Sequence, residues 1–190
     1  MNRRLLLASM ATMAAGPVLA QTNPPTTTAP APAPSGLSDA RQKHIKDTMA
    51  VGSLSLMLSR IALPKVNTLH LKQFAEFEIA EQETVADVLK ALQTNAAPTG
   101  SIQAPTDAEA MQNLDDAGKA AVDRLRGMRP GGEFDRTYIR EQVDGHRKLL
   151  DIQETYLRAP DSLDQANVAK LARGMIKEHL TLLADLEKIG

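Results

Sequence analysis

Breaks rich in proline and glycine divide this chain into long segments, and their spacing most limits the folds open to it. Between the breaks, apolar residues recur every three or four positions, which is the period of an amphipathic helix. β-Branched and aromatic residues never alternate over a useful length, so strands are not predicted. Proline removes a backbone donor and glycine favours turns, so each break predicts a helix end. The breaks lie at Pro64, at residues 95–105, at residues 129–132 and at Pro160.

The segments between the breaks predict an all-α four-helix bundle with one short crossover helix. Ser38 or Asp39 can cap the first helix, and Ser162 or Asp161 the last, because their side chains accept hydrogen bonds from free helical N–H groups. The chain has no cysteine, so disulfides do not contribute to the fold. The predicted long helices cover residues 38–63, 67–94, 134–158 and 162–188, and the crossover helix covers residues 107–128.

The first twenty residues have the pattern of an export signal. Arg3 and Arg4 precede an apolar run, and Val18 and Ala20 place small residues at the two positions that signal peptidase reads. We therefore expect residues 1–20 to be cleaved off and the protein to be periplasmic or secreted. The general secretory route fits better than the twin-arginine route, because the twin-arginine consensus is incomplete.

Residues 21–37 differ in composition from the rest of the chain. They contain five prolines among Thr, Ala and Ser, and they carry no charge. Such a stretch buries little surface and resists helix formation, so we predict a disordered linker. The remaining residues, 38–190, form the predicted bundle domain.

Composition and charge exclude several kinds of partner. The whole chain has a net charge of −1, and loss of the two signal arginines makes it more acidic, which argues against a nucleic-acid binder. Charges interrupt every apolar stretch after the signal, so no transmembrane span is predicted. The partners that remain are an envelope protein or surface, and a second copy of the chain in a homo-oligomer.

Four polar residues lie on the predicted apolar faces of the long helices. Glu78 and Glu81 interrupt the stripe of the second helix, and His146 and His179 occupy the middle of the stripes on the last two long helices. Because all four lie near mid-helix, we expect them to meet at one level of the bundle. Burying a carboxylate is costly unless it is paired or binds a metal, so this level is the candidate site.

Two interpretations of this level stay open. In the first, which we favour, His146 and His179 make buried hydrogen bonds with Glu81, Gln82 or Tyr138, and no cofactor is present. In the second, the two carboxylates and the two histidines hold a single iron, manganese or zinc ion. A di-iron carboxylate site is not predicted, because the position three residues before each histidine is apolar and the Glu-x-x-His motif is missing.

Other polar residues on the predicted helices are assigned structural roles. Ser53, Ser55 and Ser59 lie in the middle of the first helix, where serines usually serve packing. His44 and His70 have charged or polar neighbours, so both are expected on solvated faces.

Three blocks of sequence share one family pattern. They are Phe74-Ala75 with Glu81-Gln82, Phe134-Asp135-Arg136-x-Tyr138-Ile139 with Gln142-Val143-x-Gly145-His146, and Ala172 with His179-Leu180. Together, from about His44 to the C-terminus, they resemble an exported bacterial family, the domain-of-unknown-function family forty-one forty-two, often labelled an outer-membrane protein. The resemblance implies a ferritin-like fold without an established catalytic activity, and it makes His146 and His179 the family's two core histidines. The family usually has Asp-His where this chain has Glu81-Gln82.

The function expected from the sequence is that of an exported helical-bundle protein without evident catalytic machinery. It would act in envelope stress or maintenance through contacts with proteins or surfaces. The alternative is a ferritin-like metal-binding or oxidase-type protein with an incomplete site.

Overall fold

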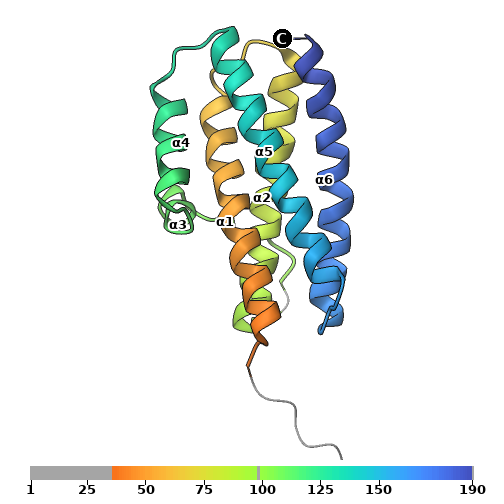
Figure 1. Cartoon of the computed structure of the whole chain (residues 1–190). Coiled ribbons are helices and arrows are strands. Elements are labelled where there is room, and N and C mark those ends of the chain that lie inside the picture. Colours follow the sequence, from red (N-terminus) through yellow and green to blue (C-terminus); the bar gives the residue numbers. More distant parts are fainter. Residues whose placement is uncertain (1–35, 98, 190) are drawn as a thin grey trace, which may run out of the picture. The chain divides into compact units, whose positions relative to one another are not determined.

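A computed structural model describes residues 36–97 and 99–189 of the chain, and over this part the fold is all-α. The predicted signal peptide and most of the predicted linker lie outside the described residues. No helix in these two ranges is long and apolar enough to cross a membrane. In chain order the helices are α1 (Asp39–Ala62), α2 (Leu69–Thr94), α3 (Asp107–Gln112), α4 (Asp116–Gly127), α5 (Gly132–Leu157) and α6 (Leu163–Ile189) (Figure 1).

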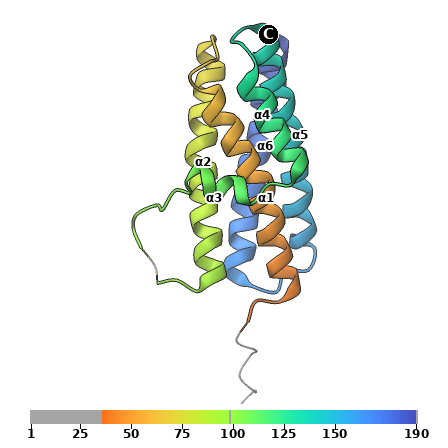
Figure 2. The same ribbon diagram turned by 90° about the vertical axis from the view of Figure 1, so that its left-hand side faces the viewer.

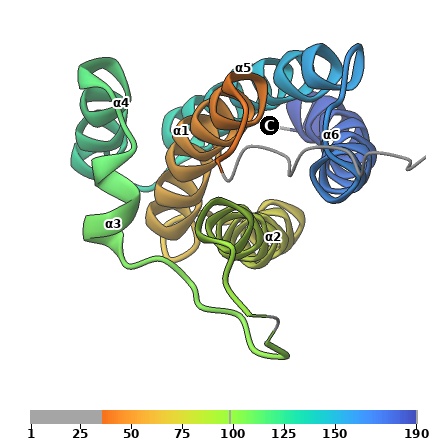
Figure 3. The same ribbon diagram turned by 90° about the horizontal axis from the view of Figure 1, so that it is seen from below.

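The four long helices α1, α2, α5 and α6 form the predicted bundle, and α3 and α4 lie outside it against α1 (Figures 2 and 3). One apolar core cluster contains three aromatic side chains: Phe74, Phe134 and Tyr138. Each of them is at most 3% exposed. The rest of this core is aliphatic and includes leucines from α1, α2, α4 and α6. Burial of apolar side chains in this cluster and in two smaller ones stabilises the bundle, as expected for a chain without disulfides.

Side-chain caps fix where the helices begin. Ser38 accepts a hydrogen bond from the Arg41 backbone N–H at 3.2 Å, which makes it the N-cap of α1. Thr68 does the same for α2 through the Leu71 N–H. Asn95 ends α2 in the left-handed conformation, with φ of 53°. Such caps satisfy backbone groups that have no partner inside the helix.

The prediction of one crossover helix over residues 107–128 is wrong. The structure breaks this segment into α3 and α4 at Asn113. The Asp115 carboxylate accepts a hydrogen bond from the Gly118 N–H at 2.7 Å and starts α4 as its N-cap. The Asn113 side chain donates to the Ser53 hydroxyl on α1 at 2.9 Å. The local cap at Asp115 competes with helix continuation, and the Asn113 bond holds the break against α1.

The buried positions of α2 follow the predicted stripe as far as Glu78 and are shifted by one residue after it. The prediction placed Glu81 among the core residues, but Glu81 is only half-buried, and Gln82 is buried in its place. The reason lies on α1, where Gly52 leaves room for the Gln82 side chain. A Cβ at position 52 would lie 2.5 Å from Gln82 Oε1. Gly52 thus lets a bulky polar side chain enter the α1–α2 contact.

His44 is buried, so the prediction that it lies on a solvated face is wrong; His70 is exposed, as predicted. The His44 ring stacks on Tyr156 at 4.4 Å between ring centroids. Its Nε2 lies 2.7 Å from Gln153 Oε1 on α5, and its Nδ1 lies 2.8 Å from Gln165 Nε2 on α6. This interior contact joins three helices, and its partners on α5 and α6 lie far from His44 in the sequence.

Hydrogen bonds to Gln165 fix the charge state of His44. The Gln165 Oε1 accepts from Arg41 Nε at 3.2 Å, and the Gln165 Nε2 donates to the Arg41 backbone carbonyl at 3.0 Å. The amide therefore presents an N–H to His44 Nδ1, which must accept. His44 is then neutral, with its proton on Nε2. Burial lowers the pKa of His44, against the opposing effects of Gln153 and Asp47.

Acid should therefore destabilise the protein through His44. Because the folded state holds the pKa of His44 below its ordinary value of 6.5, the unfolded chain binds the proton more readily. The contribution of neutral His44 to stability is complete above pH 6.5 and is lost as the pH falls below it. We expect the free energy of unfolding, measured by urea titration, to drop more steeply between pH 7 and pH 5 in the wild type than in His44→Gln. The exposed His70 provides the control, since His70→Gln should keep the pH dependence of the wild type. An equal pH dependence in all three proteins would contradict the assignment of a neutral, buried His44.

Candidate metal centre

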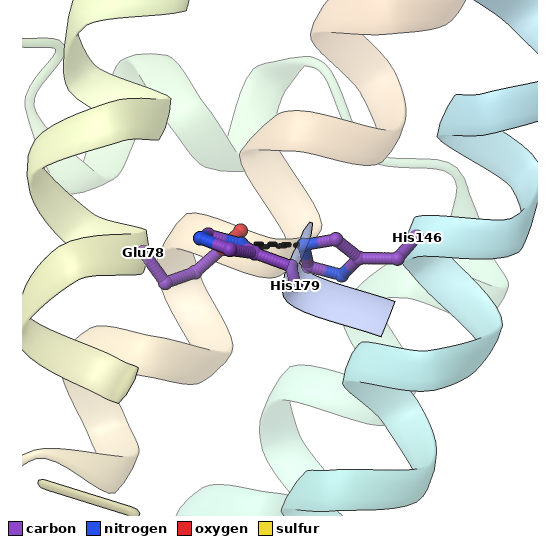
Figure 4. Close-up of side chains that lie close together, drawn as sticks. All are labelled: Glu78, His146 and His179. Carbon is purple, nitrogen blue, oxygen red and sulfur yellow. Dashed lines mark hydrogen bonds and ion pairs between the residues drawn. The ribbon is translucent and has the colours of Figure 1, made fainter. Parts of the chain in front are cut away.

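The predicted polar level exists, and three of its residues converge in the middle of the bundle. Glu78 comes from α2, His146 from α5 and His179 from α6 (Figure 4). They are buried almost completely, with exposed fractions of 0%, 1% and 5%. Their positions at mid-helix on apolar stripes place all three at the same height, which is the geometry that the sequence predicts.

Three atoms of these side chains form a small triangle. His179 Nδ1 lies 2.9 Å from Glu78 Oε2, and His146 Nε2 lies 3.2 Å from the same oxygen. The two ring nitrogens are 3.1 Å apart. All three are therefore within hydrogen-bonding distance of one another.

The outer nitrogen of each histidine has a partner that fixes its proton. His146 Nδ1 lies 2.7 Å from the Gln142 backbone carbonyl, which can only accept, so this nitrogen carries a hydrogen. His179 Nε2 lies 3.0 Å from Glu81 Oε2 and donates to that carboxylate. In their neutral forms, both histidines then turn a lone pair toward Glu78. The triangle consists of three acceptors that face one another.

Such a triangle requires a cation at its centre. Without another ion, a proton on His179 Nδ1 meets this requirement, because it can be shared with Glu78 and His146. Burial alone would lower the pKa of His179, but hydrogen bonds and charge from Glu78 and Glu81 raise it to about 9. Burial likewise opposes ionisation of Glu78, but its bonds to the two histidines hold the pKa of Glu78 well below the usual range. The carboxylates of Glu78 and Glu81 then flank the His179 imidazolium, which leaves one of their two negative charges uncompensated.

The second oxygen of Glu78 ends a chain of hydrogen bonds through the core. The Ser55 hydroxyl on α1 donates to Glu78 Oε1 and also touches the Gln142 side chain. The Gln142 amide contacts the Ser59 hydroxyl at 3.0 Å, and Ser59 lies 2.8 Å from the Tyr138 hydroxyl. Burial raises the pKa of Tyr138 well above its ordinary value, so this phenol stays protonated.

The structure assigns the other predicted site residues to different places. Glu81 contacts His179 as predicted, but from the edge of the cluster. Tyr138 reaches the cluster only through the serines and Gln142, and Gln82 lies against Gly52. Ser55 and Gln142 were not among the predicted site residues, because a serine or glutamine on a helix resembles a packing residue. Gln142 could have been found from its spacing, because it lies one helical turn before His146 on the same helix face.

The donor set fits a divalent transition-metal ion. Bonds of about 2.0–2.2 Å to nitrogen or oxygen ligands place neighbouring ligand atoms about 3.0 Å apart at octahedral angles and about 3.4 Å apart at tetrahedral angles. The triangle is therefore close to the octahedral spacing and a few tenths of an ångström tighter than the tetrahedral one. Ligand histidines in proteins donate their other N–H to a carbonyl or a carboxylate, and His146 and His179 do so. A 2+ ion with two carboxylates and two neutral imidazoles also has no net charge, which suits a buried level.

The fold and this cluster define an all-α bundle protein with a buried carboxylate–histidine centre. The chain belongs to the family described as domain of unknown function DUF4142, whose model matches residues 26–188. The resemblance seen in the sequence is thereby confirmed.

A solved structure supports the fold independently of sequence. The chain is similar to the crystal structure of a DUF305 fragment from Deinococcus radiodurans, with a TM-score of 0.63 and 12% identity over 80% of this chain and 99% of the other. At this identity the likeness shows the helical fold alone. No curated protein matches the chain.

The metal-free cluster should lose stability in alkali. His179 holds its proton more tightly in the folded state than its ordinary value of 6.5 allows, so its contribution is complete below pH 6.5 and is lost as the pH rises through about 9. In the presence of a chelator, we expect the free energy of unfolding of the wild type to fall between pH 6.5 and pH 9. His179→Gln has no such proton and should show a flatter profile over the same range, measured by urea titration. A wild-type profile that matches that of His179→Gln would contradict the assignment of the proton.

Proposed function

We propose that this protein binds one divalent transition-metal ion through Glu78, His146 and His179. The observation that carries the proposal is the arrangement of protons around the triangle. The outer nitrogens of both histidines are committed to Gln142 and Glu81, so three lone pairs converge on one point. A purely structural network would pair donors with acceptors, and here the inner atoms are all acceptors unless an extra cation is added.

The chemistry of the ligand atoms limits which metal ions the site can bind. Two imidazoles and one carboxylate suit zinc, iron and manganese, whereas calcium and magnesium prefer oxygen ligands. Because the three ligands are nearly inaccessible to solvent, the site is suited to holding an ion and not to presenting it to a large substrate. We therefore propose metal binding or storage, without a catalytic step.

Binding of one ion per chain is the direct test. We expect zinc, manganese or ferrous iron to bind with a stoichiometry of one in isothermal titration calorimetry, and the complex to survive dialysis in elemental analysis. An ion at 100 times its dissociation constant should add about 2.7 kcal/mol to the free energy of unfolding. Because the ion replaces the His179 proton, the affinity should rise about tenfold per pH unit between pH 6.5 and about 9.

Variants separate this site from adventitious binding. Glu78→Gln keeps the shape of the side chain and removes its charge, and it should weaken binding strongly. His44→Gln removes a buried histidine that does not contact the cluster, and it should leave the affinity unchanged. Binding that persists in a Glu78→Gln, His179→Gln double variant, or a wild type that binds no ion, would show that the triangle holds only a proton.

We also propose that the protein is exported and works in the cell envelope through contacts with a protein or surface. The support for export is the pattern of residues 1–20, and the support for contacts is an exposed apolar pair on the bundle. Phe77 on α2 and Leu182 on α6 are 58% and 42% exposed and line one cavity of about 260 Å³. The pair offers an apolar surface to a partner.

Export predicts a defined N-terminus. In a bacterial host, we expect the mature protein to begin at Gln21 and to be found in the periplasmic fraction, with the N-terminus determined by mass spectrometry. The variant Ala20→Asp places a charge where signal peptidase needs a small residue, so the precursor should accumulate. A cytosolic protein that keeps Met1 would contradict the proposal.

A further inference from the structure

The metal centre has one side that reaches solvent. On the α1 and α5 sides, Ser55 and Gln142 cover it, with exposed fractions of 3% and 1%. The Phe74 ring covers another side, with its centroid 5.2 Å from that of His179 and 6.2 Å from that of His146. Among the described residues that hydrogen-bond to the cluster, Glu81 is different, because 30% of its side chain is exposed.

Glu81 touches the cluster and the solvent at once. It lies three residues after Glu78, so both carboxylates project from the same face of α2. Its Oε2 is 3.0 Å from His179 Nε2, whereas His179 Nδ1 points inward to Glu78. The His179 ring therefore separates an inner carboxylate from an outer one. A cation that approaches from solvent meets the outer carboxylate first.

The approach between α1 and α5 is blocked by groups that are costly to move. A path between α1 and α5 would break the bonds that join Glu78, Ser55, Gln142 and Ser59. Buried polar groups that lose their partners destabilise the fold, because no water replaces the lost bonds. Rotation of the Glu81 side chain breaks one hydrogen bond, and water replaces the lost partner because the carboxylate is already partly hydrated.

We propose that Glu81 is the capture residue of the centre, through which a divalent cation is taken from solvent and exchanged. This inference rests on the proposed metal binding at Glu78, His146 and His179. Glu81 then has two separable roles. Its negative charge attracts the cation and sets the rate of association, and its hydrogen bond orients His179 and sets the rate of dissociation.

Two substitutions at position 81 separate these roles. Glu81→Gln removes the charge but leaves an amide that reaches His179, whereas Glu81→Asp keeps the charge on a side chain that is too short to keep the same hydrogen bond. The matched control is Glu76→Gln, which removes an equal charge from an exposed position on the same helix. The probe is zinc ion alone, followed by stopped-flow competition with a chromophoric chelator.

We expect Glu81→Gln to lower the association rate constant about tenfold and to reduce its dependence on ionic strength, because the attraction at the point of capture is lost. Glu81→Asp should keep an association rate near that of the wild type and should dissociate faster. Glu76→Gln should match the wild type in both rates.

Each outcome has one meaning. If Glu81→Gln associates as fast as Glu76→Gln and only its dissociation changes, Glu81 merely positions His179 and the capture role is wrong. If Glu81→Gln does not fold, Glu81→Asp still decides, because an association rate that falls despite the retained charge would overturn the proposal. If the wild type binds no zinc, the metal centre itself is wrong, and that result is distinct from a failure of the capture role.

Discussion

The bundle depends on how three buried acceptors are kept from repelling one another. Glu78, His146 and His179 come from three different helices, and each presents an electron pair to the other two. A positive charge at the centre turns this repulsion into a contact that joins α2, α5 and α6. Because the contact is short and directional, it specifies the heights of these helices more sharply than aliphatic side chains can.

The polar chain behind Glu78 extends this specification to α1. Ser55 and Ser59 lie one turn apart on α1, and Gln142 on α5 contacts both hydroxyls. Aliphatic contacts tolerate small shifts between helices, but a hydrogen bond does not. The core thus combines two kinds of interaction. Apolar burial supplies most of the free energy of folding, and the polar level selects one arrangement of the four helices.

The sequence predicted the parts of this molecule that depend on local chemistry. Ser38 and Pro160 mark helix ends because capping and proline geometry act within a few residues. Every end of the four long helices was predicted to within two residues. The meeting of Glu78, His146 and His179 was also predictable, because the helical period places each at mid-helix on an apolar stripe. The break at Asn113 was missed because a bond to Ser53, far away in the chain, helps to create it.

The predictions failed where the packing of one helix determines which residues of a neighbouring helix are buried. His44 has charged neighbours in sequence, yet Gln153 and Gln165 enclose it from two other helices. Glu81 and Gln82 are adjacent, and the space beside Gly52 accommodates the buried amide, whereas the carboxylate contacts His179 at the edge of the bundle core. Neither fact follows from the period of a single helix. Partners from distant segments of the chain must be known before such residues can be assigned.

The shared space of Gly52 and Gln82 has a consequence for how this bundle can change over evolutionary time. The atom that would obstruct a side chain at position 52 is the far end of the Gln82 side chain and not backbone. A larger residue on α1 therefore needs only a shorter or displaced residue at position 82, with the two helices where they are. The two positions behave as one exchangeable unit. A new polar group could reach the core from α1 by a pair of substitutions, without any change in the path of the backbone.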